Sequence, residues 1–160
     1  MTAPRQEPER ERRGEERPRR ESRHAAREAA VQMLYQWEIG KLSMLEVMST
    51  YWTPGLTHDE PVSDELREFA VALTNGVAAS IERIDPLIVE AAQHWRIERM
   101  AVTDRIILRL AVYEFLDQPE TPARVIINEA LELARTFSSD DAVRFINGIL
   151  DGIRRTLQRE

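Results

Sequence analysis

Apolar residues recur along most of the chain at the three- and four-residue spacing that is typical of amphipathic helices. The first apolar stripe consists of Ala26, Ala30, Met33, Leu34 and Trp37. It predicts a helix that starts at Ser22 and ends before Gly40. A second, short helix is predicted after Ser43, because Ser43 and Glu46 have the spacing of a capping box.

The middle of the chain begins with a loop over residues 53–62, which contains two prolines and a glycine. Ser63, followed by two acidic residues, can cap a third helix. The apolar face of this helix is Leu66, Phe69, Ala70, Leu73, Val77, Ile81 and Ile84. Asp85 and Pro86 have the form of a cap followed by proline at the first helical position. They predict a new short helix that runs to about Trp95.

The second half of the chain predicts three more helices. One begins near Thr103, and its residues 106–112 are apolar nearly all round, as expected of a buried central helix. Thr121 and Pro122 repeat the cap-plus-proline start for the next helix, and a turn at residues 138–140 precedes the last. No segment of useful length alternates with period two, and no repeat of 20–50 residues occurs. We therefore expect an all-α bundle of about seven helices.

Composition limits the classes of function. The chain has 160 residues and no cysteine, which excludes disulfides, thiolate metal sites and a cysteine nucleophile. No apolar run approaches the ~18 residues of a membrane span, and the N-terminus does not have the pattern of a secretory signal. We expect a cytoplasmic protein.

Charge is distributed unevenly along the chain. The net charge of −6 argues against nucleic-acid binding, yet residues 1–28 carry nine arginines and seven glutamates. Residues 1–21 are mostly Arg, Glu and Pro, and we expect them to form a disordered charged tail. The folded domain is predicted to be residues 22–160.

The sequence contains no recognisable catalytic motif. His24, His58 and His94 lie far apart, without the spacing of helical metal ligands. The glycines are dispersed, so no phosphate-binding loop is present, and no Gly-x-Ser-x-Gly elbow occurs. We expect neither an enzyme nor a bound metal or cofactor.

A cationic edge on the first predicted helix is the strongest candidate for binding. Arg20, Arg23 and Arg27 are spaced i, i+3 and i+7, and His24 and Tyr35 project from the same side. Guanidinium groups beside planar side chains suit the phosphates and unstacked bases of single-stranded RNA. The alternative is an ordinary charged helix face on which the arginines pair with glutamates.

Three ordered blocks in the second half resemble the NusB transcription antitermination family. They are Asp104–Glu114, Pro122–Phe137 and Arg144–Asp151, and Arg23–Gln32 looks like the arginine-rich start of that family's first helix. The resemblance covers roughly residues 22–155. It implies an all-helical fold of two three-helix subbundles plus an extra helix.

The resemblance also implies a function. Such proteins pair with NusE, a small-subunit ribosomal protein, and together they bind the boxA element of nascent RNA. The complex joins RNA polymerase with other Nus factors and suppresses premature termination, chiefly in ribosomal RNA operons. No reaction is catalysed, and the protein acts by assembly.

The family motifs imply roles for particular residues. Arg23 and Arg27 match the arginine-rich motif and are expected to contact RNA phosphates. Phe145, after Arg144, is expected to stack on a base, and Asp141 lies close to that surface. The alternatives are a core role for Phe145 and a capping role for Asp141.

Two further sets of positions match the family. Tyr35 and Asp104 match positions near the NusE contact. The residues that identify the family best are expected to serve packing and buried hydrogen bonds; they are Asn128, Glu129, Asn147 and Gly148.

Other functions stay open at the level of sequence. A NusB-like domain also occurs at the N-terminus of some ribosomal-RNA cytosine methyltransferases, although nothing after Leu157 is expected to house a methyl-donor domain. A structural adaptor, or a homodimer that masks the RNA surface, is a further alternative. The arginines of residues 5–19 alternate with glutamates, and residue 25 is alanine where some relatives have a basic residue. Both features lower the attraction for phosphate that is expected at these positions.

Overall fold

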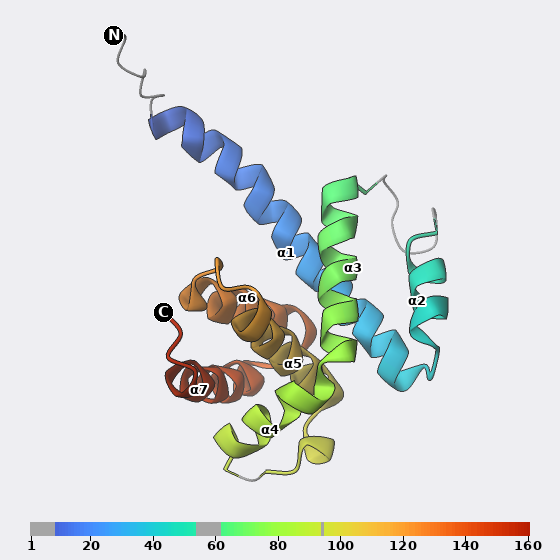
Figure 1. Cartoon of the computed structure of the whole chain (residues 1–160), viewed down its shortest axis with the longest axis vertical. Coiled ribbons are helices and arrows are strands. Elements are labelled where there is room, and N and C mark those ends of the chain that lie inside the picture. Colours follow the sequence, from blue (N-terminus) through green and yellow to red (C-terminus); the bar gives the residue numbers. More distant parts are fainter. Residues whose placement is uncertain (1–8, 54–61, 94) are drawn as a thin grey trace.

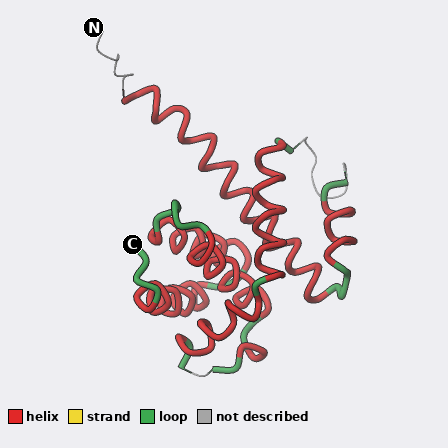
Figure 2. The backbone as a smooth tube through the Cα atoms, viewed as in Figure 1, coloured by secondary structure: helices red, strands yellow, loops and turns green. Residues whose placement is uncertain are grey.

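The computed structural model describes residues 9–53, 62–93 and 95–160, with side chains described from residue 21 onward. These residues form seven α-helices, a short 3-10 helix and no strand (Figures 1 and 2), which confirms the all-α class. The α-helices are α1 (Glu9–Ile39), α2 (Met44–Tyr51), α3 (Asp64–Ala79), α4 (Ile81–Ala91), α5 (Val102–Asp117), α6 (Ala123–Phe137) and α7 (Asp140–Thr156). The 3-10 helix, η1, is Ile97–Arg99.

The predicted caps of two helices are confirmed. Ser43 accepts a hydrogen bond from the amide of Glu46, whose carboxylate accepts one from the amide of Ser43, so α2 begins with a complete capping box. Ser63 caps α3 by accepting from the amide of Leu66. The helix after the turn at residues 138–140 is capped by Ser139, which accepts from Ala142.

Helix α1 begins at Glu9, upstream of Ser22, and its first turns extend away from the other helices (Figure 1). Glutamate and arginine dominate this stretch of the sequence, and both are good helix formers. The expected disorder of residues 1–21 stays a prediction, and residues 1–8 lie outside the described part of the chain.

The predicted helix start at Asp85–Pro86 is wrong, because the break falls at Ser80 and Pro86 lies inside α4. Ile84 and Ile88 are fully buried on one face of α4, and Asp85 binds Arg109 of α5. These contacts keep the segment helical even though proline cannot donate to the carbonyl of Glu82. A smaller difference is that α6 starts one residue late, after Pro122 rather than at it.

The buried residues form two apolar clusters. The smaller joins α1, α2 and α3, with Met33, Val47, Tyr51 and Ala70 among its members. The larger is built around α5, which packs on α1, α3, α4, α6 and α7, so α5 is the central helix that the sequence predicts. Helix α1 contributes to both clusters from different sides.

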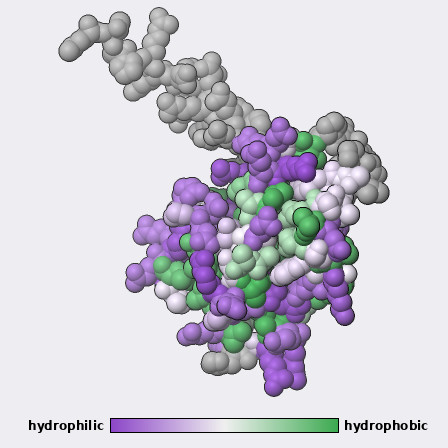
Figure 3. Space-filling view, turned by 45° about the vertical axis from the view of Figure 1, so that its right-hand side comes forward, coloured by the Kyte–Doolittle hydropathy of each residue, from purple (hydrophilic) through white to green (hydrophobic). Residues whose placement is uncertain are grey.

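Charged groups line the outside of this bundle. Figure 3 shows polar residues over most of one face, with smaller apolar patches between them. In the described residues, no helix is long and apolar enough to cross a membrane.

Candidate nucleic-acid interface

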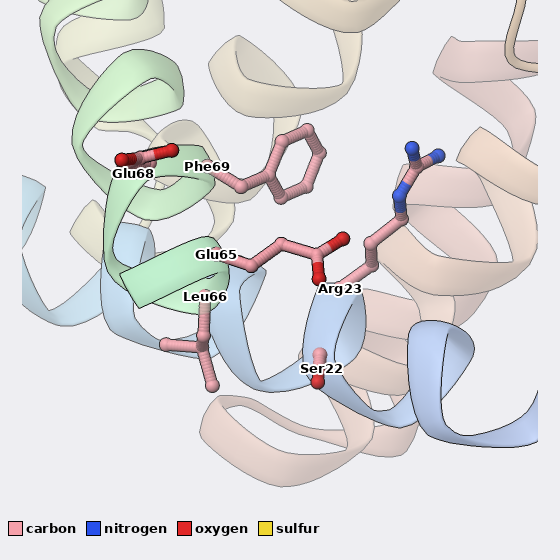
Figure 4. A pocket seen from close by; sticks show the side chains of 6 residues that line it. All are labelled: Ser22, Arg23, Glu65, Leu66, Glu68 and Phe69. Carbon is pink, nitrogen blue, oxygen red and sulfur yellow. The ribbon is translucent and has the colours of Figure 1, made fainter. Parts of the chain in front are cut away.

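Arg23 is the exposed cation at the edge of α1. Its guanidinium carbon lies 5.3 Å from the ring centroid of Phe69 on α3, a cation–π distance. Both residues line a cavity of about 310 Å³ together with Ser22, Glu65, Leu66 and Glu68 (Figure 4). The figure shows Arg23 entering the cavity from α1 and Phe69 from α3. Arg23 is therefore placed on an aromatic support with its donors open to solvent.

Arg27 lies in a different environment, because only 3% of it is exposed. Its guanidinium binds the carboxylate of Glu114 on α5, with Nη2 at 2.7 Å from Oε1 and Nε at 3.0 Å from Oε2. Its Nη1 also lies 3.8 Å from Glu129 of α6. The expected contact of Arg27 with phosphate does not fit this placement, since its donors already face the carboxylates of Glu114 and Glu129.

His24 is held between two carboxylates. Nδ1 lies 2.7 Å from Oε2 of Glu129, and Nε2 lies 2.8 Å from Oε1 of Glu28. Both contacts are hydrogen bonds only when the imidazole is protonated, because a neutral ring has one N–H. Burial lowers the pKa of His24, but the hydrogen bonds and charges of Glu129 and Glu28 outweigh it, and the net pKa is raised.

The predicted residues on α7 form a second exposed group. Asp141 and Arg144 are 94% and 83% exposed and face each other at 3.3 Å. Phe145 is 38% exposed and lies outside both apolar clusters of the described residues. Ser139, and not Asp141, caps α7. This placement does not fit the core alternative for Phe145 or the capping alternative for Asp141.

Helix α6 connects the two groups. Its Glu129 binds His24, and α7 follows its C-terminal end after two residues. The described contacts do not join Arg23 directly to Phe145. Arg20 has no described side chain, and His58 and His94 lie outside the described residues.

The expected packing role of the family-identifying residues is wrong for three of them. Asn128, Asn147 and Gly148 are exposed, and an atom added at Cβ of Gly148 would have nothing within 4 Å. Glu129 does make partly buried polar contacts, as predicted, through His24 and Arg27. Exposure of Asn147 and Gly148 beside Phe145 enlarges the candidate surface on α7.

Tyr35 lies at a second, apolar groove of about 400 Å³, which Thr103, the neighbour of Asp104, also lines. Tyr35, which is 45% exposed, lines it with Val31, Gln32, Gln36, Tyr51, Thr103 and Phe137. Asp104 follows Thr103 and accepts a hydrogen bond of 2.6 Å from Ser138, next to Phe137. The groove thus brings Tyr35 together with Thr103, the residue before Asp104.

Two residues of the site were not predicted from the sequence. Phe69 was assigned only to an apolar face, yet it supports Arg23 and Arg27, the latter at 5.6 Å. Glu114 follows the predicted buried stretch 106–112 on the same helix, and a carboxylate so close to it is a signal that a buried cation is needed. In the described residues no group of three potential ligands is arranged so that it could hold a metal ion.

Comparisons with known proteins agree with this architecture. The NusB family matches residues 24–155. The transcription antitermination protein NusB of Koribacter versatilis is 46% identical over 139 residues, which are 87% of this chain and 92% of the relative. NusB of Solibacter usitatus is 41% identical, over 85% of this chain and 90% of its own.

Solved structures give the same result. NusB of T. maritima has a TM-score of 0.69 and 30% identity, covering 86% of this chain and 91% of its own. A chain from the crystal structure of antitermination factors NusB and NusE in complex with dsRNA has a TM-score of 0.75 at 23% identity. It covers 85% of this chain and 98% of its own, and at that identity it supports the fold alone. On the family match and the relatives together, the chain belongs to the NusB family of transcription antitermination proteins.

Proposed function

We propose that the protein binds boxA RNA together with NusE and assembles with RNA polymerase and other Nus factors. In this role it suppresses premature termination in ribosomal RNA operons. Membership of the NusB family over residues 24–155 carries the proposal. The protein acts in the cytoplasm, by assembly and not by catalysis.

The RNA surface that we propose has two parts. On α1, Arg23 offers donors to phosphate, and His24 adds a second cation when protonated. On α7, Phe145 offers an exposed ring for a base, and Arg144 lies beside it. Asp141 lies 3.3 Å from Arg144 on the same exposed face. Cations with neighbouring aromatic rings are the groups that single-stranded RNA needs.

Binding of the protein mixed with NusE to boxA RNA, against a scrambled RNA, tests this proposal. Fluorescence anisotropy across a salt series should show tighter binding to boxA at every salt concentration. Equal affinity for both RNAs would overturn the sequence-specific function. Binding that does not change with salt would exclude phosphate contacts altogether.

NusE is proposed to bind at the apolar groove between Tyr35 and Phe137. The groove joins α1, α2, α5 and α6, and its wall is apolar apart from a few hydroxyl and amide groups. An apolar depression of this kind with a polar rim is typical of a protein interface. Asp104 lies at that rim, where its Oδ1 is held by Ser138.

Asp104→Lys tests the partner groove, with Glu120→Lys as a matched charge reversal at an exposed residue of the α5–α6 turn. Asp104→Lys should weaken NusE binding in calorimetry, and Glu120→Lys should not. Normal NusE affinity of Asp104→Lys would remove Asp104 from the interface. A homodimer of the free protein stays a prediction, and sedimentation of the same samples measures it.

A further inference from the structure

One buried arginine joins four helices at the cationic edge. Arg27 of α1 binds Glu114 of α5 through two nitrogens and lies 3.8 Å from Glu129 of α6. Its guanidinium also lies over the ring of Phe69 on α3. A planar guanidinium can contact two carboxylates and a ring face at once, which an ammonium group cannot.

Two of these partners also hold the exposed cations. The ring of Phe69 lies under Arg23 at 5.3 Å as well as under Arg27 at 5.6 Å. The same Oε2 atom of Glu129 faces Arg27 and accepts from His24 at 2.7 Å. Arg23 and His24 therefore each share one partner with Arg27.

We infer that Arg27 is a positioning residue of the RNA surface and not an RNA contact. It fixes Phe69 and Glu129, and these fix Arg23 and His24. Arg27 also offsets the charge of Glu114 and Glu129, which would otherwise repel phosphates from beneath the edge. The inference deepens the proposed function and rests on it.

Glu114→Gln distinguishes the two possible roles of Arg27, because the two roles predict different changes in RNA affinity. Glu114 is 1% exposed and cannot touch RNA. If Arg27 contacts phosphate, removing the competing carboxylate frees it, and RNA affinity rises or stays equal. If Arg27 positions the edge, loss of its anchor weakens binding of boxA RNA with NusE present, by severalfold, although the protein has lost a negative charge.

The variants Arg27→Met and Arg27→Met with Glu114→Gln complete a double-mutant cycle. The positioning role predicts that the double variant loses no more RNA affinity than the single variant that binds RNA more weakly. Additive losses would overturn it. If Arg27→Met does not fold, Glu114→Gln still decides the question, since the amide keeps the size and one acceptor of the glutamate.

Arg109→Met is the matched control for loss of an arginine ion pair that is largely shielded from solvent. Arg109 binds Asp85 through two contacts of 2.8 Å and also faces Glu38. Glu38 lies fourteen residues, ~21 Å, along α1 from His24. Arg109→Met should lower Tm but leave RNA affinity of the folded protein unchanged. Equal loss of RNA affinity in Arg109→Met would reduce Arg27 to a general stability role.

The pKa of His24, measured by NMR titration, tests the inference without RNA. Removing the nearby positive charge of Arg27 should by itself raise the pKa of His24. If Glu129 also loses its position, the hydrogen bond to His24 weakens and the pKa falls towards its ordinary value. A fall in Arg27→Met, absent from Arg109→Met, supports positioning, and a rise contradicts it. If the protein does not bind boxA RNA but the pKa of His24 falls in Arg27→Met, the proposed function is rejected and the positioning role of Arg27 is kept.

Discussion

Arg23 and Arg27 are one helical turn apart on α1, yet burial gives them different chemistry. Arg23 has its donors in solvent and stacks on Phe69, whereas Arg27 donates hydrogen bonds to the carboxylate of Glu114. Their spacing in the sequence is compatible with a shared role, because it places both on the same face of the helix. The spacing does not show how deeply each side chain is buried. Depth is set by partners that lie 87 residues further along the chain.

Arg23→Ala should weaken binding of boxA RNA and flatten its salt dependence. Loss of one phosphate contact to single-stranded RNA lowers the slope of log affinity against log salt by ~0.7. The measurement is anisotropy with NusE present from low to high salt. An unchanged slope would place Arg23 outside the phosphate contacts, even if affinity fell.

Phe145→Ala should reduce RNA affinity by ~1–3 kcal/mol, the range for a base stacked on an aromatic ring. Stability should change little, because Phe145 is 38% exposed and lies outside the two apolar clusters of the described residues. Thermal melting and RNA titration of one preparation measure both effects. A large drop in Tm at normal RNA affinity would assign Phe145 to the core instead.

His24 should make stability depend on pH. Its folded pKa is raised above the unfolded value of about 6.5, so the stabilising effect of its charge is fully present below that pH. This effect is lost as pH rises through the folded pKa. Thermal melting across a pH series that starts below 6.5 and rises through the folded pKa should show a steeper decline for the wild type than for His24→Gln. Parallel curves would mean that the two carboxylates do not hold the proton.

At the level of the helices, polar capping residues predict the helix starts better than the apolar stripes predict the helix breaks. Ser43 and Ser63 cap the helices that they were expected to cap, since local hydrogen bonds decide those ends. The break at Ser80 was missed because the apolar stripe from Leu66 to Ile84 continues through it. An apolar stripe shows which face of a helix is buried. It does not reveal a break between two helices when α3 and α4 both keep their apolar face towards the core.

Gly148→Ala on α7 should stabilise the fold by about 1 kcal/mol, because alanine favours a helix more than glycine does. The new methyl group would meet no atom within 4 Å. Gly152→Ala is the matched control, since its nearest neighbour is Ala91 at 3.9 Å, an ordinary contact. Thermal melting should show a similar gain for both variants. A loss of stability in Gly148→Ala would contradict the open surface described for that position.

The same pair of variants tests the exposed face of α7. Gly148 lies one turn from Phe145, so a methyl group there stands where a bound RNA would approach. Gly148→Ala should weaken RNA binding despite its higher stability, and Gly152→Ala should not. Equal RNA affinity for both would confine the contact to the turns before residue 148.

At the scale of the whole molecule, the resemblance to NusB and the helical periodicity together predicted the class of fold, but not how the site is assembled. The family motif assigns Tyr35 and Asp104 to one partner surface, and the packing of α1 on α5 and α6 places Tyr35 in one groove with Thr103, the residue before Asp104. Phe69 was not assigned to the site, because its role depends on how α3 crosses α1. Such crossings arise from packing between elements, which the pattern within one element does not contain.

Sharing of α1 between the two apolar clusters should make the protein unfold as one unit. Met33 faces the smaller cluster while Leu34, the next residue, faces the larger one, so α2 and α3 cannot separate from α1 without exposing both. Thermal unfolding followed by far-UV circular dichroism should coincide with that followed by fluorescence of Trp52, which packs on the smaller cluster. Trp37→Phe with Trp95→Phe isolates the Trp52 signal. A Trp52 transition several degrees below the loss of helix would show that the smaller cluster opens first and that α1 alone does not couple the two.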